Sequence, residues 1–230
     1  IAPSATGSSP APGSAPATSE AAPAAPALAA ASAESFTLVV GKSTVVIRNR
    51  GAAVESWTID GSVENSKNPV ELVHPYDRME GHALPLSFAG EPAADVKTLN
   101  EALWQCAAAG NRLDCEYAGG GLHAKKTLVL HENYLHDLTI AVERDGKPLS
   151  LATRWGPGLG HELSAKERAV RLSGVRAESY LANDSIARPL AFRSSDGEKS
   201  VSGPLRWYGL TDNFYGALFG PAARSFEFKE

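Results

Sequence analysis

The chain has 230 residues and a formal net charge of −4, from 22 basic and 26 acidic residues. A nucleic-acid-binding protein usually carries a basic excess that displaces counterions from phosphates, so this balance argues against nucleic-acid partners. No stretch reaches the ~20 consecutive apolar residues that a membrane-spanning helix needs. The opening at Ile1 lacks the basic start and apolar run of a signal peptide, so we expect a processed or excised fragment.

Alanine and proline dominate residues 1–35, with small polar residues between them. Such a segment carries too little large apolar surface to offset the conformational entropy that ordering would cost. We therefore expect a disordered Ala/Pro-rich linker over residues 1–35, semi-extended because of its prolines. A single folded domain is expected over residues 36–230.

From Phe36 onward, short β-branched and aromatic runs alternate with turn signals, which is typical of an all-β sandwich or barrel. Within residues 134–142, apolar side chains such as Leu138 and Ile140 fall on one face, as in a half-buried antiparallel strand. Helical periodicity is limited to one or two turns over 162–168. The expected strands, in chain order, are 36–40, 44–48, one within 51–61, 125–130, 134–142, 149–155, 171–175, 205–208, 215–219 and 225–228.

One hairpin can be drawn residue by residue from the sequence. The pair Gly110-Asn111 suits a two-residue turn with positive φ, and this turn fixes the register of the flanking strands. Cys106 then faces Cys115 at a non-hydrogen-bonded position, where the Cα atoms approach to ~4.5 Å. That separation lies near the lower end of the range that a disulfide accepts.

The two cysteines of the chain are therefore candidates for a disulfide, provided that the compartment is oxidising and hence extracytoplasmic. An alternative is two buried thiols that act as small hydrophobic side chains. A zinc site is less favoured, because zinc normally takes four ligands and the nearest histidine, His123, lies in the following strand.

A glycine- and proline-rich stretch, WGPGLG, occupies residues 155–160. Its glycine spacing matches neither dinucleotide- nor phosphate-binding loops, and no clear helix follows it. Residues 156–159 instead suit a type II turn, since proline fixes φ and the next glycine accepts a positive φ. We interpret the stretch as a structural corner at the core edge, formed by Trp155, Gly156, Pro157, Gly158 and Gly160.

The sequence contains only weak signals for catalytic residues. His136 lies on an apolar strand face and is interpreted as a core or rim histidine with one hydrogen bond. His161 lacks the second histidine of a zinc-protease motif, and no GxSxG nucleophile motif is present. Lys125 and Lys126 are interpreted as a solvated strand edge. The residues alone therefore predict no catalytic group, no metal and no cofactor.

Several stretches, taken in order, resemble the large periplasmic domain of the YidC family of bacterial membrane protein insertases. The RWGPGLG corner is the most specific of them, and the others support it by their order. They cover about residues 36–228 and are TLVVGKSTVVIRNRGAAVESWTI (37–59), NPVELV (68–73), LPLSF (84–88), LNEALWQC (99–106), CEYAGGGLHAKKTLVLHENYLHDLTIAV (115–142), LSLATRWGPGLG (149–160) and LRWYGLTDNFYGALFGPA (205–222).

This resemblance implies a β-supersandwich of two large antiparallel sheets, as in galactose mutarotases, on the periplasmic side of the bacterial inner membrane. It implies a transmembrane helix before the linker and a membrane-embedded insertase core after Glu230. The implied role is non-catalytic support of membrane protein insertion and folding, through contacts with the Sec translocon, its accessory subunits or nascent membrane proteins. The insertase groove lies outside this chain, so no insertase residue is assigned here and the binding residues stay unknown.

A second hypothesis remains open on the same fold. A carbohydrate-binding or aldose-epimerase-like protein would need a histidine and a carboxylate that converge in one cleft as acid and base. The segment HENYLHDL (131–138) is at best a faint match to the corresponding histidine motif.

Overall fold

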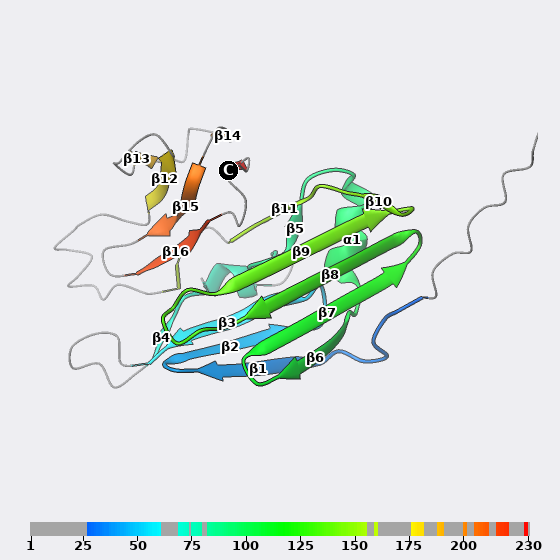
Figure 1. The fold of residues 1–230 in the computed structure, drawn as a ribbon, viewed down its shortest axis with the longest axis horizontal. Helices are drawn as coiled ribbons and strands as arrows, with labels where there is room; N and C mark the ends of the chain where they lie inside the picture. The colour runs from blue at the N-terminus through cyan, green and yellow to red at the C-terminus, as the bar shows by residue number, and fades with distance from the viewer. Residues whose placement is uncertain are drawn as a thin grey trace, which may run out of the picture.

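The protein is an all-β sandwich, and its described residues include one short α-helix (Figure 1). All strand pairs among these described residues are antiparallel, as the sequence texture predicts. The computed structural model describes residues 27–60, 69–73, 75–79, 82–155, 159–160, 176–181, 188–190, 200–201, 205–211, 215–220 and 228–229. Among the helices in these ranges, none combines the length and the apolar character that crossing a membrane requires.

The first sheet has four strands in sequence order, each paired with the next. Its inner face buries Leu38, Val45, Ile47, Val54 and Trp57. The first three strands confirm strands predicted from the sequence. The fourth is a two-residue strand that was not predicted. The strands are β1 (Ser35–Val40), β2 (Ser43–Arg48), β3 (Ala53–Ile59) and β4 (Val70–Glu71).

The second sheet has five strands in the order β10-β9-β8-β7-β6. The hairpin register agrees with the Gly110-Asn111 turn, since Cys106 pairs with Cys115. β9 starts three residues later than predicted, because Tyr134 adopts φ 62° in the preceding turn. The strands are β6 (Gln105–Ala109), β7 (Arg112–Gly119), β8 (Leu122–Val129), β9 (Asp137–Arg144) and β10 (Lys147–Pro148).

Shorter sheets complete the fold. The predicted strand 149–155 is reduced to a two-residue strand, and the predicted strands 205–208 and 215–219 are confirmed. The predictions for 162–168, 171–175 and 225–227 lie outside the described residues. The strands are β5 (Phe88–Ala89) with β11 (Ala152–Thr153), the sheet β13 (Arg188–Leu190), β12 (Arg176–Leu181), β15 (Leu205–Thr211) and β16 (Gly216–Phe219) in that order, and β14 (Ser200–Val201) with β17 (Phe228–Lys229).

The helix α1 (Ala93–Glu101) and the 3₁₀ turn η1 (Pro75–Arg78) were not predicted from the sequence. Only one large apolar side chain of α1, Leu99, is fully buried, so no helical stripe is visible in the sequence. The helix is attached by Asn100, whose side-chain amide accepts from the N–H of Phe88 (2.9 Å) and donates to its carbonyl (3.0 Å). A strand-like pair of bonds therefore holds the helix against β5.

The core between the two large sheets centres on Trp104, which is fully buried. Its indole N–H donates to the carbonyl of Leu99 at 2.9 Å, and its ring stacks on Phe88 with centroids 6.0 Å apart. Burial of large aromatic side chains with their polar groups paired is a strong stabilising contribution.

Lys126 lies in this core, which corrects its interpretation as a solvated residue. It alternates in phase with Leu122, Ala124 and Leu128, the inward residues of β8, and is 4% exposed, whereas Lys125 faces solvent. Its ammonium donates to the carbonyls of Gly51, Ala52 and Leu86 at 3.0, 3.2 and 2.6 Å and lies 4.2 Å from the centroid of the Phe88 ring. All three donors are thus satisfied, although burial lowers the pKa of Lys126 to about 7.

The segment that leads into β1 lies against the sandwich. Leu28 forms a bridge with Ala118 of β7, and the buried Asn49 side chain bonds to the carbonyl of Ser32 (2.8 Å) and the N–H of Glu34 (3.0 Å). Residues 27–34 were assigned to the linker by composition. The boundary between linker and domain at residue 35 stays a prediction.

Candidate functional site: an apolar pocket between two strand edges

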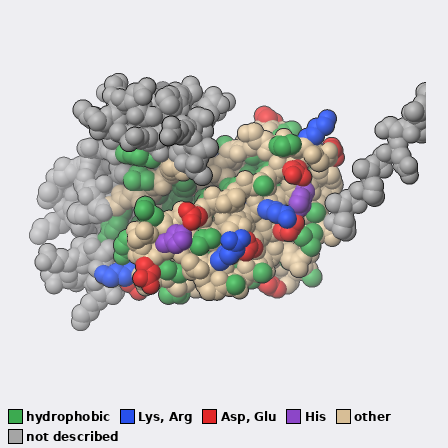
Figure 2. All heavy atoms as spheres, in the orientation of Figure 1, with side chains coloured by type: hydrophobic (Ala, Val, Ile, Leu, Met, Phe, Trp, Pro, Cys, Tyr) green, Lys and Arg blue, Asp and Glu red, His purple; other side chains and the backbone are tan. Residues whose placement is uncertain are grey.

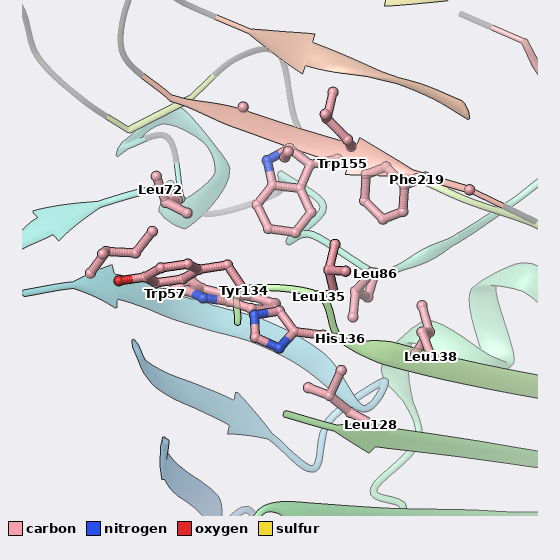
Figure 3. A pocket seen from close by; sticks show the side chains of 15 residues that line it. Trp57, Leu72, Leu86, Leu128, Tyr134, Leu135, His136, Leu138, Trp155 and Phe219 are labelled. Carbon is pink, nitrogen blue, oxygen red and sulfur yellow. The ribbon is translucent and has the colours of Figure 1, made fainter. Parts of the chain in front are cut away.

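A cavity of about 370 Å³ lies between the start of β9 and β16 (Figure 3). Figure 1 shows where these two strands lie in the fold. Its walls are almost entirely apolar and come from segments far apart in the chain. The lining residues are Trp57, Ile59, Leu72, Leu86, Leu128, Tyr134, Leu135, His136, Leu138, Trp155, Gly216, Ala217, Leu218, Phe219 and Gly220. Its volume lies within the range of ~300–1,000 Å³ that is typical of ligand pockets.

The turn between β8 and β9 forms one rim of the pocket. Its left-handed residue, Tyr134, turns the chain, and the N–H of Leu135 donates to the side chain of Asn133 at 3.1 Å. Non-glycine residues in this conformation are uncommon and concentrate in turns and at functional sites. Leu135 is left 72% exposed, which is unusual for a large apolar side chain beside a cavity.

His136 follows Leu135 in the chain and contributes an ionisable ring to the pocket lining. Its Nδ1 accepts a hydrogen bond from the N–H of His131 at 3.1 Å, as the sequence interpretation of one bond expects, and its ring lies 5.0 Å from that of Trp57. Burial, and then the nearby His131, lower the pKa of His136, while Asp137 acts in the opposite direction. The ring is therefore neutral near pH 7 and carries its proton on Nε2.

Glu71 fixes the wall that contains Trp57. One carboxylate oxygen accepts from the N–H groups of Trp57 (2.8 Å) and Val73 (2.9 Å). The other accepts from the hydroxyl of Ser56 at 2.6 Å and pairs with Arg78. Four donors therefore hold this carboxylate and, through it, the backbone of β3 behind the pocket.

Trp155 forms the opposite wall. Its ring lies 5.9 Å from Trp57 and 5.7 Å from Phe219, centroid to centroid, so it packs at the core edge as expected (Figure 3). Its buried indole N–H has no hydrogen-bond partner among the described residues. An unpaired buried donor costs about 1–3 kcal/mol.

The corner after Trp155 is described only in part. Gly160 donates its N–H to the carbonyl of Leu72 at 3.0 Å, and Leu159 bridges Val73. A Cβ on Gly160 would collide with the backbone carbonyl of Val73, so glycine permits this close approach. Gly156, Pro157 and Gly158 lie outside the described residues, and their role in a turn stays a prediction.

Asp77 of η1 is buried beside this corner. It is 3% exposed, and its Oδ2 atom has no hydrogen-bond partner among the described residues. Burial raises the pKa of Asp77 to about 6, although Arg154 and Arg78 act to lower it. Trp155 and Asp77 thus each bury a polar atom that has no hydrogen-bond partner among the described residues, and of the two only Trp155 lines the pocket.

The two cysteines lie in the second sheet and do not line this pocket. The structure joins Cys106 and Cys115 by a disulfide between β6 and β7, with Cα atoms 4.1 Å apart. Cys115 is buried and Cys106 partly buried. The disulfide closes the edge hairpin, and Cys115 borders a small cavity together with Leu128 and Leu138 of the pocket lining.

The outer face of β7, β8 and β9 carries charges of both signs (Figure 2). His123 bonds to Glu116 at 2.7 Å and approaches Glu143 at 3.8 Å, and Lys125 pairs with Glu116 at 3.1 Å. Over the described part of the chain, no group of three or more His, Cys, Asp or Glu side chains is arranged to hold a metal ion. This face contrasts with the apolar pocket.

The pocket can bind apolar groups, but its described lining offers little for chemistry. Among the described residues, the lining contains one histidine, one tyrosine hydroxyl and no carboxylate, lysine or arginine. General acid–base catalysis on a sugar needs a second titratable group in reach of the substrate. The sequence points to His136 and Trp155 separately, as a rim histidine and a core-edge ring. The exposed Leu135 and Leu218 were not predicted to be part of a site, because no sequence spacing joins residues 135 and 218.

Comparison with known proteins gives one informative match. No protein-family model matches the chain. The chain is 25% identical over 191 residues to a protein of Endomicrobium trichonymphae named membrane protein insertase YidC. This similarity covers 82% of the chain but 32% of the relative, so the chain spans about a third of the length of the curated relative that it matches. The similarity thus indicates a distant relationship to one part of a YidC insertase.

Proposed function

We propose that this chain forms a non-catalytic extracytoplasmic domain of a YidC-like insertase, on the periplasmic side of the inner membrane. The supporting observation is the similarity to the YidC relative across most of the chain. In this role the domain supports insertion and folding by contacting nascent membrane proteins, the Sec translocon or its accessory subunits.

The apolar pocket supplies a physical means for such contacts. Two large apolar side chains at its mouth, Leu135 and Leu218, are 72% and 53% exposed. Exposed apolar groups that border a cavity mark interaction sites more often than isolated ones do. An emerging membrane segment is rich in apolar side chains and matches this surface in chemistry.

Site-specific cross-linking tests the proposal. A photoreactive amino acid replaces Leu218 at the pocket mouth or, as a matched control, Val39, which is 64% exposed on β1 away from the pocket. In the full-length gene product, during synthesis of a membrane protein, we expect cross-links from position 218 to the nascent chain or a Sec subunit. Equal labelling from both positions, or none, would contradict the proposal.

The carbohydrate hypothesis is not favoured by a specific feature of the described pocket. An aldose-epimerase-like site needs a carboxylate beside the histidine, and the described lining places none beside His136. Calorimetric titration with aldoses and a mutarotation assay would revive this hypothesis if either gave a signal that His136→Ala abolishes.

A further inference from the structure

The edge of β9 that borders the pocket offers unused backbone groups. β9 pairs with β8 along its whole length but with β10 only at Glu143 and Arg144. Beyond β10, the N–H of Leu149 donates to the carbonyl of Val142 at 2.8 Å, so Val142 directs its polar backbone groups away from β8.

Two further residues of β9 share this orientation. Backbone direction alternates along an antiparallel strand, so Ile140 and Leu138 also point their N–H and C=O groups away from β8. None of these four groups bonds to another described residue. An unpaired strand edge of this kind can accept another extended chain.

This free edge runs directly into the pocket. The side chain of Leu138 lines the cavity, and Leu135 and His136 precede it in the chain (Figure 3). Ala217, Leu218 and Phe219 of β16 form the facing wall. A chain that paired with Leu138 and Ile140 would therefore direct alternate side chains toward an apolar cavity.

The free backbone groups of β9 and the apolar lining of the pocket together indicate which class of ligand would bind there. The free N–H and C=O groups require a partner with both acceptors and donors at strand spacing, which an acyl chain lacks. The described lining carries no Asp, Glu, Lys or Arg, so it favours uncharged apolar side chains over charged ones. An extended apolar polypeptide meets both conditions, whereas a sugar meets only the hydrogen-bonding one.

We propose that the β9 edge at Leu138 and Ile140 accepts an extended apolar segment of a nascent polypeptide as an added strand, with a large side chain of that segment seated in the cavity that Trp155 and β16 line. This inference rests on the proposed function for the identity of the partner. It goes further by assigning the binding mode, the strand edge and the side-chain preference.

Backbone methylation of a peptide tests the binding mode. The probe is a short fluorescent peptide with a central Phe flanked by Val and Thr, whose binding to the folded protein is followed by anisotropy. Methylating the alternate amides on one edge of the peptide should weaken binding about tenfold through lost hydrogen bonds, while methylating those on the other edge should leave affinity unchanged. Equal affinities for both methylated peptides, or no binding of the parent peptide, would overturn the proposal.

Two measurements locate the added strand on the protein. Amide hydrogen exchange at Leu138 and Ile140 should slow when the peptide binds, because both N–H groups gain acceptors. Leu218→Asp should weaken peptide binding at least about tenfold by placing a charge at the pocket mouth, and the matched Val39→Asp should not. Unchanged exchange at both amides, or equal affinities of the two variants, would contradict this assignment.

The outcomes separate this inference from the proposed function. Cross-linking of position 218 to nascent chains without the methylation asymmetry would keep the function and remove the added strand. The methylation asymmetry without cross-links to nascent chains or Sec subunits would keep the strand-accepting edge and remove the proposed function.

Discussion

The inner core and the pocket region treat their buried polar groups differently. In the inner core, around Trp104 and Lys126, the indole N–H has an acceptor and the ammonium has three. In the pocket region, the indole N–H of Trp155 in the pocket wall and one carboxylate oxygen of Asp77, outside the lining, have no partner among the described residues. Unsatisfied buried groups reduce stability, so the pocket region contributes less to stability than the inner core.

The largest effect is expected for Trp104→Ala in the inner core, and the same substitution at Trp155 in the pocket wall serves as its comparison. This change removes a fully buried ring, its stacking on Phe88 and its hydrogen bond. We expect a loss of about 3–5 kcal/mol in the free energy of unfolding, measured in urea. A loss below that of Trp155→Ala would reverse the comparison.

Removal of the buried ammonium should have the next largest effect. Lys126→Met leaves the carbonyls of Gly51, Ala52 and Leu86 without this donor. We expect a loss of about 1–3 kcal/mol at pH 7. Lys125→Met, at the exposed neighbour on the same strand, is the matched control and should stay within about 0.5 kcal/mol. Equal losses in the two variants would show that the three hydrogen bonds add nothing.

The pH dependence of stability gives an independent check on Lys126. The unfolded chain keeps the lysine proton up to a pKa of about 10.4, whereas burial lowers the folded pKa to about 7. Between these values the unfolded state binds more protons, so the wild type should gain stability relative to Lys126→Met as the pH rises from 7 to 10. Parallel pH profiles for the two proteins would contradict a buried titrating lysine.

A smaller effect is expected for Trp155→Ala in the pocket wall. Trp155 is only partly buried, and its substitution also removes the unpaired N–H. We expect a loss of about 1 kcal/mol in the free energy of unfolding, together with loss of peptide binding in the anisotropy assay. A variant that binds the peptide as tightly as the wild type would show that this wall is not part of the binding site.

The smallest expected effect is a gain of stability. The folded pKa of Asp77 is raised to about 6, above the unfolded value of about 3.9, so the ionised carboxylate costs stability above pH 6. Asp77→Asn should therefore stabilise the protein at pH 7.5, and this gain should disappear toward pH 4. A thermal melt at each pH measures the difference. Destabilisation at pH 7.5 would mean that the charges of Arg154 and Arg78 stabilise the carboxylate more than burial destabilises it.

Much of the fold follows from local patterns in the sequence. The Gly110-Asn111 pair sets the register of β6 and β7, and alternation identifies most residues of β1, β2 and β9. Lys126 was misplaced because its charge was weighed above its phase, although Leu122 and Leu128 on the same strand mark its position as inward. The helix α1 escaped because its buried surface is almost a single leucine.

The pocket could not be predicted from spacing alone. Trp57, Trp155 and Phe219 meet only after three separate sheets have formed, and no short-range pattern joins them. The free edge of β9 depends on where β10 stops pairing, which is set by the two-residue Asp145-Gly146 turn and the path of the chain after Leu149. Sequence patterns predict strands well, but which edges stay uncovered depends on the whole topology.

The attachment of residues 28–34 has a mechanical consequence. Leu28 exchanges two backbone hydrogen bonds with Ala118 in the second sheet, and Asn49 in the first sheet holds Ser32 and Glu34. Tension applied to the chain ahead of Leu28 would reach both layers of the sandwich before it could peel β1 from β2. A force on this segment would therefore move the two sheets together, and the attachment points at Ala118 and Asn49 would set their orientation relative to the force.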